Sequence, residues 1–137
     1  ASQLKKLKKF NYERNKIAKI YNQNLRKYSD FITIQKIPKN CTHSYQMYTI
    51  RVIKKLRNSF IFYLKSREIE ASAHFDPPLH KQKLFKKYKK DKLNNTEILS
   101  NEIVTLPMFP GLTKKEINYI LKVINDWYLK QKKWKIF

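Results

Sequence analysis

The segment 70–82, EASAHFDPPLHKQ, joins a strand-like pattern to two prolines and two histidines. Ahead of the prolines, apolar residues alternate with polar ones: Ile69, Ala71, Ala73 and Phe75 against Glu70, Ser72 and His74. The alternation predicts a strand over 69–75, with Ile69 and Phe75 facing a layer of helices and His74 on the opposite face beside Ser72. The prolines end the strand and fix the direction in which His80 emerges. His74 is then either a site residue or a surface histidine bonded to a nearby loop.

A strand–helix–strand unit surrounds this segment. YTIRVI at 48–53 has strand composition, and 54–67 has apolar residues at helical spacing. A long amphipathic helix is predicted over 3–29, and 31–34 can form a short extended piece. The other face of the long helix is mostly lysine. That helix either continues from an upstream segment, packs on a missing neighbour, or is an ordinary solvated helix.

Seven lysines and one aspartate follow the prolines in 81–92, with Leu84, Phe85 and Tyr88 at helical spacing. The run is typical of a solvated helix face. It can also attract an anionic ligand to the rim of a site. Beyond it, the sequence predicts a short helix over 95–101 and a short strand over 103–106.

LPMFPGLTKKEI at 106–117 carries a helix-start signal. Thr113 and Glu116 match the S/T-x-x-E capping box, and Leu112 and Ile117 are placed for a hydrophobic staple. A helix must therefore begin at this point. Its apolar stripe, which we interpret as core, consists of Ile117, Ile120, Leu121, Ile124 and Tyr128.

The composition indicates one folded domain with a strongly basic surface. The chain has 137 residues, 42% of them hydrophobic, and a net charge of +21. A core of useful size can form at this length. The charge is compatible with nucleic-acid binding. However, 26 of the 31 basic residues are lysine, and arginine is the side chain that best reads bases and grips phosphates. Compositional bias explains the lysines equally well.

Several classes of site are excluded by counts and spacing. The single glycine, Gly111, cannot supply a glycine-rich phosphate loop. The single Cys41 cannot form an internal disulfide, which together with the lack of a membrane-spanning run predicts a soluble cytoplasmic protein. His43, His74 and His80 are too dispersed for a metal motif, and the ten acidic residues show no catalytic pairing.

Four stretches in a fixed order carry a family resemblance. They are a leading helix with Arg14, Ala18, Tyr21 and Leu25, then HSYQMYTIRV at 43–52, AHFDPPLHKQ at 73–82, and LPMFPGLTKKEI at 106–117. Over roughly residues 4–128 the chain resembles the C-terminal third of the DegT/StrS family of sugar aminotransferases. These are pyridoxal-phosphate enzymes of fold type I that act on nucleotide-linked keto sugars.

The resemblance implies the α/β (α+β) small domain of fold-type-I aminotransferases, with a long N-terminal helix, a β-α-β unit, a third short strand and a C-terminal helix. We expect a connecting helix over 1–29, the small domain over 30–129 and a basic extension over 130–137. It implies pyridoxal phosphate as cofactor of the complete enzyme and a nucleotide sugar as substrate. The implied partners are a large cofactor-binding domain or subunit and a homodimer mate, with no membrane partner.

The resemblance also assigns residues. His74, Phe75 and His80 match the family's HY/HF-x-P-x-H segment, and with Gln82 and Lys83 they would bind the substrate. The lysine that holds the cofactor lies in the family's large domain, so we expect no cofactor, no catalytic residue and no transamination from this chain alone. Many relatives have glycine at the position of Glu68, which must therefore adopt a left-handed conformation or end its helix differently.

Two other interpretations stay open. A basic RNA- or ribosome-associated protein would use its lysines with Trp127, Trp134 and the tyrosines as a binding surface. An interaction module would dock on a separate large-domain subunit. Under the family interpretation, the chain is a fragment, a separately encoded half or the product of a decayed gene.

Overall fold

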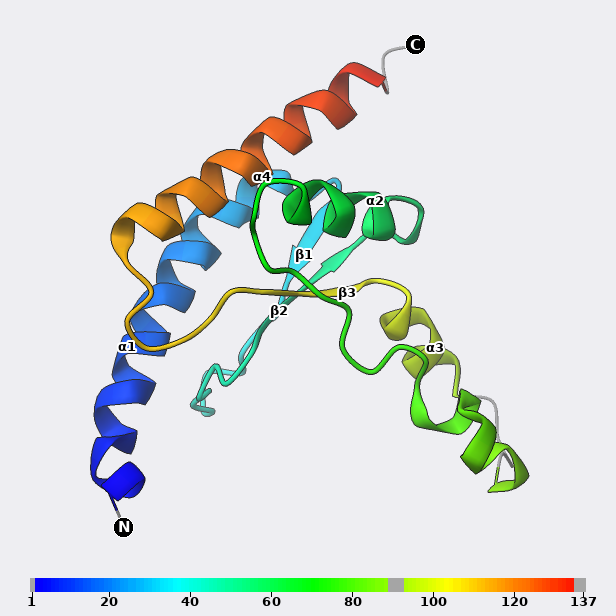
Figure 1. Ribbon diagram of the computed structural model, residues 1–137, viewed down its shortest axis with the longest axis horizontal. Coiled ribbons are helices and arrows are strands. Elements are labelled where there is room, and N and C mark those ends of the chain that lie inside the picture. The colour runs from blue at the N-terminus through cyan, green and yellow to red at the C-terminus, as the bar shows by residue number, and fades with distance from the viewer. Residues whose placement is uncertain (1, 89–92, 135–137) are drawn as a thin grey trace.

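Three helices cover one face of a three-stranded antiparallel sheet in the computed structural model, which describes residues 2–88 and 93–134 (Figure 1). The α-helices are α1 (Ser2–Leu25), α2 (Lys54–Lys65), α3 (Asn94–Ser100) and α4 (Lys114–Trp134). The strands are β1 (Ile32–Ile34), β2 (Tyr48–Val52) and β3 (Ile103–Leu106). Three short 3-10 helices are η1 (Arg26–Tyr28), η2 (Leu79–Lys81) and η3 (Lys83–Tyr88). The predicted fold class is confirmed, while one of its elements differs.

The strand order is β1-β2-β3, with Ile32 opposite Val52 and Ile50 opposite Val104. Tyr48, Ile50 and Val52 are buried, whereas Arg51 between them is exposed. Successive side chains of a strand point to opposite faces, so the buried set marks the face that the helices cover. The other face carries polar side chains such as Arg51 and Thr33.

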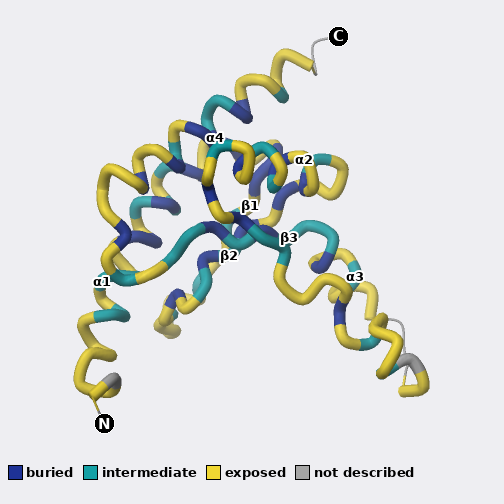
Figure 2. Tube along the Cα trace, viewed as in Figure 1, coloured by how far each residue is buried: buried dark blue, intermediate teal, exposed yellow. Residues whose placement is uncertain are grey.

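The core lies between this face and α1, α2 and α4 (Figure 2). Its largest buried side chain is Trp127, which is 1% exposed and whose ring centre lies 4.6 Å from that of Phe60. Trp134, seven residues further along α4, is 80% exposed. Burying an aromatic side chain of this kind contributes about 2–3 kcal/mol. Trp127 is therefore a core residue, and the expectation that it belongs to an RNA-binding surface is wrong.

The helix over 114–134 starts where the capping box predicts. The Thr113 backbone N–H donates to Glu116 Oε2 at 2.7 Å, and the Glu116 N–H donates to Thr113 Oγ1 at 3.2 Å. These bonds satisfy two backbone donors that the first helical turn leaves free. Leu112 and Ile117 are both buried. The helix continues through Trp134, so the described part of the expected basic extension is helical.

The predicted strand over 69–75 forms only an isolated bridge. Ser72 pairs antiparallel with Thr105 at the free edge of β3, so the second strand of the predicted β-α-β unit is wrong as an element. Ile69 and Ala71 are buried as expected, but Phe75 is 72% exposed and has a φ of 59°. The chain therefore turns away from the sheet after Ser72, and Phe75 does not share the inward face of Ile69.

Two further expectations concern α1 and the lysine run. Leu4 and Leu7, near the start of the predicted amphipathic helix α1, are exposed, while Ile17, Ala18, Tyr21 and Leu25 are buried. The first turns of α1 thus extend beyond the core. In the lysine run, the structure has the 3-10 helix η3 over 83–88 in place of a longer amphipathic helix. Residues 89–92 lie outside the described residues.

Candidate functional site

The turn after Ser72 presents His74 and Phe75. His74 is exposed, and its Nε2 shares a hydrogen bond of 3.2 Å with Ser72 Oγ. The pairing places His74 beside Ser72 as the alternation predicts. The Phe75 ring lies next to the His74 ring, with centres 6.4 Å apart. One imidazole and one phenyl ring are therefore displayed together on the surface, able to donate a hydrogen bond and to stack.

The turn is fixed from the inside by a buried arginine that the sequence analysis did not single out. Arg57 on α2 is 7% exposed, and its Nη2 donates to Asp76 Oδ2 at 2.7 Å. The same guanidinium donates to the carbonyls of Ser100 and Asn101, each at 3.2 Å. In the sequence, the sign of this role is that Arg57 shares a helix face with the apolar Phe60 and Leu64, which follow it by about one and two turns.

His80 and Lys81 attach the next turn to α3. His80 Nε2 lies 3.2 Å from Glu97 Oε1, and Lys81 Nζ donates to Glu97 Oε2 at 2.6 Å. The hydrogen bond from Lys81, followed by that from His80, lowers the pKa of Glu97 below its usual range. The His80 side chain is only 11% exposed. His80 therefore lies against α3 rather than beside the open His74 and Phe75 rings.

Gln82 and Lys83 complete the predicted set. Gln82 Nε2 donates to the carbonyl of Pro77 at 3.3 Å, which closes the turn that begins with the cis Asp76–Pro77 peptide. Lys83 is exposed. The structure thus brings the five predicted residues into one short turn region with two roles. His74, Phe75, Gln82 and Lys83 are exposed, and two of them, His74 and Gln82, also hydrogen-bond to the protein, whereas His80 is half-buried against α3.

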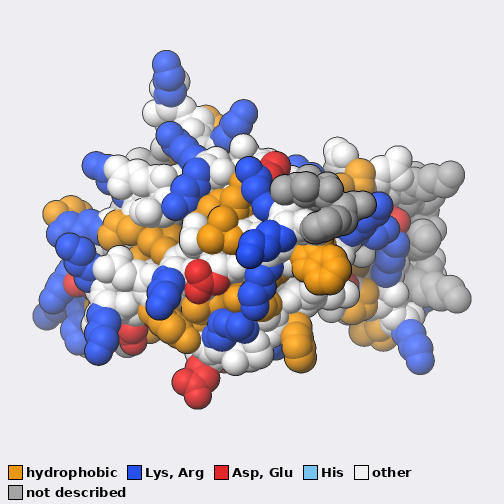
Figure 3. Space-filling view, turned by 90° about the horizontal axis from the view of Figure 1, so that it is seen from above, with side chains coloured by type: hydrophobic (Ala, Val, Ile, Leu, Met, Phe, Trp, Pro, Cys, Tyr) orange, Lys and Arg blue, Asp and Glu red, His pale blue; other side chains and the backbone are white. Residues whose placement is uncertain are grey.

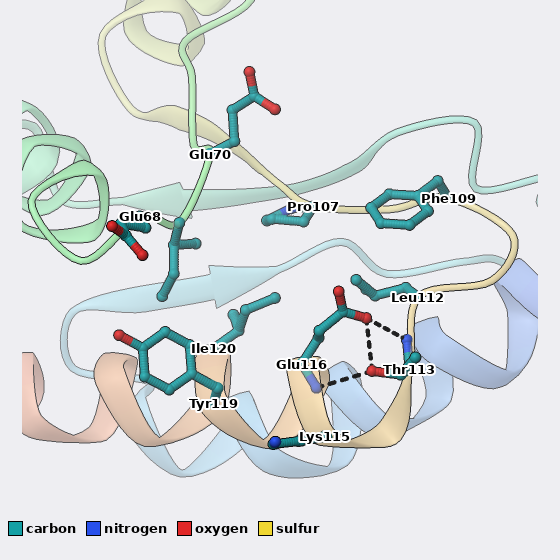
Figure 4. Close-up of a pocket in the computed structure, with 11 residues that line it drawn as sticks. Glu68, Glu70, Pro107, Phe109, Leu112, Thr113, Lys115, Glu116, Tyr119 and Ile120 are labelled. Carbon is teal, nitrogen blue, oxygen red and sulfur yellow. Dashed lines mark hydrogen bonds between the residues drawn. The ribbon is translucent and has the colours of Figure 1, made fainter.

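A second feature is a cavity of about 620 Å³ beside the start of α4 (Figure 4). Its inner lining includes the buried Ile69 and Ile120, and the half-exposed rings of Phe109 and Tyr119 stand on two sides of it. Three carboxylates line it as well: Glu68, Glu70 and Glu116. None of the five predicted site residues reaches this cavity.

The cavity does not suit pyridoxal phosphate. Among the described residues, three carboxylates line it against one basic side chain, Lys115, and such a lining repels a phosphate. Glu116 is already used by Thr113, whose hydroxyl lowers the pKa of the Glu116 carboxyl. An aldehyde cofactor needs a lysine together with cationic or N–H groups for its phosphate. Apart from Lys115, this described lining offers no cationic side chain for that purpose.

The stretch 43–52 forms an aromatic row. The ring centres of His43 and Tyr45 are 4.4 Å apart, and Tyr48 then stacks between Tyr45 and Tyr21. His43 Nδ1 accepts a hydrogen bond of 2.9 Å from the Tyr45 backbone N–H, which holds Tyr45 at a φ of 47°. Burial raises the pKa of both Tyr21 and Tyr48 above their usual range. These hydroxyls are therefore structural donors at neutral pH.

Within residues 2–88 and 93–134, no cluster of three or more His, Cys, Asp or Glu side chains could hold a metal ion. In the same part of the chain, none of the helices has the length and apolar character needed to cross a membrane.

The chain combines an antiparallel sheet that helices cover on one face with a turn, held by two prolines, that presents His74 and Phe75. These features are those of a known family of proteins. The model of the DegT/DnrJ/EryC1/StrS aminotransferase family matches residues 1–125. The chain belongs to this family, which confirms the resemblance stated above.

Individual relatives agree with this assignment. A dTDP-3-amino-3,6-dideoxy-alpha-D-galactopyranose transaminase of Aneurinibacillus thermoaerophilus is 26% identical over 85% of this chain and 31% of its own length. The crystal structure of a family aminotransferase from Brucella abortus is 26% identical, with a TM-score of 0.83 over 93% of this chain and 33% of its own. A Bacillus subtilis structure with bound cofactor PMP shares the fold, with 18% identity, a TM-score of 0.77, and coverage of 87% of this chain and 28% of its own. The chain therefore spans about a third of the length of these relatives.

Proposed function

We propose that this chain is the small-domain part of a pyridoxal-phosphate-dependent aminotransferase that transfers an amino group to a nucleotide-linked keto sugar. The observation that carries the proposal is the turn over 74–83, where the family motif AHFDPPLHKQ holds His74 and Phe75 open to solvent on a fixed backbone. A curated relative is named as a transaminase of a dTDP-linked amino sugar. The aromatic and imidazole rings suit a sugar or base, and Lys83 suits a phosphate.

The cofactor belongs, in this proposal, to a large domain or subunit that supplies the lysine and the phosphate site. The acid-lined cavity supports that division, since its carboxylates disfavour a phosphate. When bound there, the cofactor acts as the electron sink for amino transfer. This chain contributes binding and orientation: His74 and Phe75 contact the substrate, and the capped helix α4 supports the fold. By itself the chain does not transaminate.

The proposed partners follow from this separation between a cofactor-binding large domain or subunit and the small domain. The face of the sheet that carries Thr33 and Arg51 is polar, and no helix of the described residues covers it, so it is available to a large domain or a homodimer mate. The lysine run adds attraction for a diphosphate, with Lys81, Lys83 and Lys87 as its exposed described members, of which Lys81 is bound to Glu97. A cytoplasmic location is part of the proposal, because the single exposed Cys41 fits a reducing compartment.

Nuclear magnetic resonance of the isotope-labelled chain tests the substrate assignment. Titration with a nucleotide-diphosphate sugar should shift the signals of residues 74–83, with affinity in the millimolar range because the rest of the cleft is absent. His74→Ala should remove most of these shifts, whereas Lys114→Gln at the start of α4 should leave them intact. Shifts that are spread over all lysine-rich surfaces and vanish at about 0.15 M salt would contradict the proposal.

A further inference from the structure

One side chain holds both ends of a protruding segment. The segment, here called the arm, comprises the described residues 77–88 and 93–99 and carries η2, η3 and most of α3; Figure 1 shows these elements extending away from the sheet. Arg57 donates to Asp76, the residue just before the arm, at 2.7 Å. It also donates to the carbonyls of Ser100 and Asn101, just after the arm, at 3.2 Å each. The arm therefore leaves and re-enters the body of the protein at one guanidinium.

The burial of Arg57 makes these contacts mutually dependent. Arg57 is 7% exposed, and a buried guanidinium that loses its anion or its carbonyls keeps an uncompensated desolvation cost. Its planar fork can reach three acceptors in different directions, whereas a lysine ammonium on a flexible stem cannot reproduce that geometry. Releasing Asp76 therefore also weakens the contacts of Arg57 with the end of α3.

A second pair of contacts joins the same two stretches of chain, before residue 77 and after residue 99. The Thr105 N–H donates to the Ser72 carbonyl at 2.8 Å, and the Ser72 N–H donates to the Thr105 carbonyl at 3.3 Å. Within the arm, Glu97 of α3 binds His80 and Lys81 of η2. The arm is thus tied to itself through Glu97 and to the body through Ser72, Thr105 and Arg57. His74 and Phe75 lie between these two attachments to the body.

We propose that Arg57 is the positioning residue for the 74–76 turn and the arm, so that the direction in which His74 and Phe75 face is set by a side chain on α2. That this direction matters for a nucleotide sugar rests on the proposed function; the mechanical role of Arg57 does not. Arg57 touches no substrate in this scheme. It acts through Asp76 and through the C-terminal carbonyls of α3.

Hydrogen exchange of the backbone amides in the full chain tests the proposal, with Arg57→Lys and Asp76→Asn as variants. Arg57→Lys should speed exchange roughly tenfold or more, the loss expected for hydrogen bonds to a charged group, at both ends of the arm. The reporters are the amides of Lys81 and Gln82 at one end and of Asn101 and Glu102 at the other, all of which donate hydrogen bonds. Asp76→Asn should have its larger effect at the first pair. Amides of α1 and α4 should be unchanged.

Arg51→Gln is the matched control. Arg51 also pairs with a carboxylate, Glu102 at 2.6 Å, but its side chain is 47% exposed and lies on the open face of the sheet. This variant should leave exchange of the Lys81, Gln82 and Asn101 amides as in the parent; the Glu102 amide is left out of this comparison because Arg51 binds the Glu102 side chain. If Arg57→Lys leaves the arm amides unchanged, or speeds α1 and α4 equally, Arg57 is not a positioning residue and the proposal is wrong.

A nucleotide-sugar titration of the same variants separates this proposal from the function. Faster exchange in the arm, together with weaker sugar-nucleotide shifts at His74 and Phe75, supports both. Faster exchange in Arg57→Lys, together with a parent chain that never responds to the sugar nucleotide, supports the role of Arg57 and overturns the proposed function. Binding that is equal in parent and Arg57→Lys, despite faster exchange, overturns the claim that Arg57 positions the substrate-facing rings.

Discussion

At the scale of single residues, Glu68 shows how a residue other than glycine ends a helix. It follows the end of α2 and has a φ of 58°, so of the two outcomes predicted for this position it takes the left-handed conformation. A side chain with a Cβ adopts this conformation at a cost of about 1 kcal/mol. The preceding carbonyl, that of Arg67, accepts a hydrogen bond of 3.3 Å from the Tyr119 hydroxyl, which helps to hold the turn.

Glu68→Gly should therefore stabilise the protein. We expect the free energy of unfolding to rise by about 0.5–1 kcal/mol, because glycine adopts positive φ without the steric cost. Urea denaturation followed by circular dichroism measures the change. Glu68→Ala is the control: it removes the same carboxylate but keeps the Cβ, so it should give no such gain. Equal stabilisation by both variants would assign the effect to charge and contradict the conformational argument.

At the scale of elements, α3 depends on Glu97 for its attachment to η2. The pKa of Glu97 is lowered by Lys81 and then by His80 in the folded protein. A carboxyl whose folded pKa is depressed adds stability above its unfolded pKa, and that contribution is lost as the pH falls through the folded pKa. The attachment of η2 to α3 should therefore be fully formed at neutral pH. It should weaken as the pH falls below about 4.3, the ordinary value for glutamate.

Glu97→Gln should reproduce the effect of acid at neutral pH. It removes the charge that Lys81 and His80 bind, so the amides of Lys81 and Gln82 should exchange faster at pH 7 than in the parent. Exchange rates, corrected for the intrinsic effect of pH, should converge between variant and parent once the pH has fallen through the depressed folded pKa of Glu97. A variant that differs from the parent equally at neutral pH and at the acid end of the titration would contradict the assignment.

The elements differ in how well the sequence predicts them, for local reasons. The start of α4 follows from Thr113 and Glu116 alone, because a capping box is a contact within one turn. The segment 69–75 alternates like a strand, yet after Ser72 it leaves the sheet. Its course depends on Asp76 meeting Arg57, which lies 19 residues earlier on another element. The alternation of apolar and polar residues does not show which distant residues form such an ion pair.

The features of the candidate site also differ in how well the sequence predicts them. The exposure of His74 beside Ser72 follows from strand alternation, and the family motif places the turn. The pairing of His80 with Glu97 joins residues 17 apart and could not be predicted from either motif. The cavity next to α4 is lined by Glu68, Phe109 and Tyr119. These residues are far apart in the sequence and come together only in the folded chain.

At the scale of the whole molecule, the charge is unbalanced. Lysine and arginine number 31 against ten acidic residues, and Figure 3 shows basic side chains spread over the face in view. Of the ten acids, the ones with ion pairs in the described part of the chain are Asp76, Glu97 and Glu102. Most of the positive charge is therefore compensated only by solvent and counterions, and folding brings it closer together.

Added salt should therefore stabilise the fold. Raising sodium chloride from about 0.02 to 0.2 M shortens the screening length from over 20 Å to under 10 Å. We expect the melting temperature to rise by a few degrees. A scan by circular dichroism over this range measures it, with sucrose at matched osmolality as the control for nonspecific exclusion. A melting temperature that falls with salt would show that the few ion pairs, such as Arg57 with Asp76, outweigh the repulsion.

The two tryptophans of α4 give this molecule a built-in optical probe. Trp127 lies in the core against Phe60, and within the described residues its indole N–H meets no hydrogen-bond acceptor, whereas Trp134 stands in water. Their fluorescence therefore comes from two environments of opposite polarity on one helix. With Trp134 replaced by phenylalanine, the remaining emission reports only on the packing of α4 against Phe60 of α2 and Phe31. The packing of the domain can then be followed by the emission wavelength of Trp127, without any attached dye.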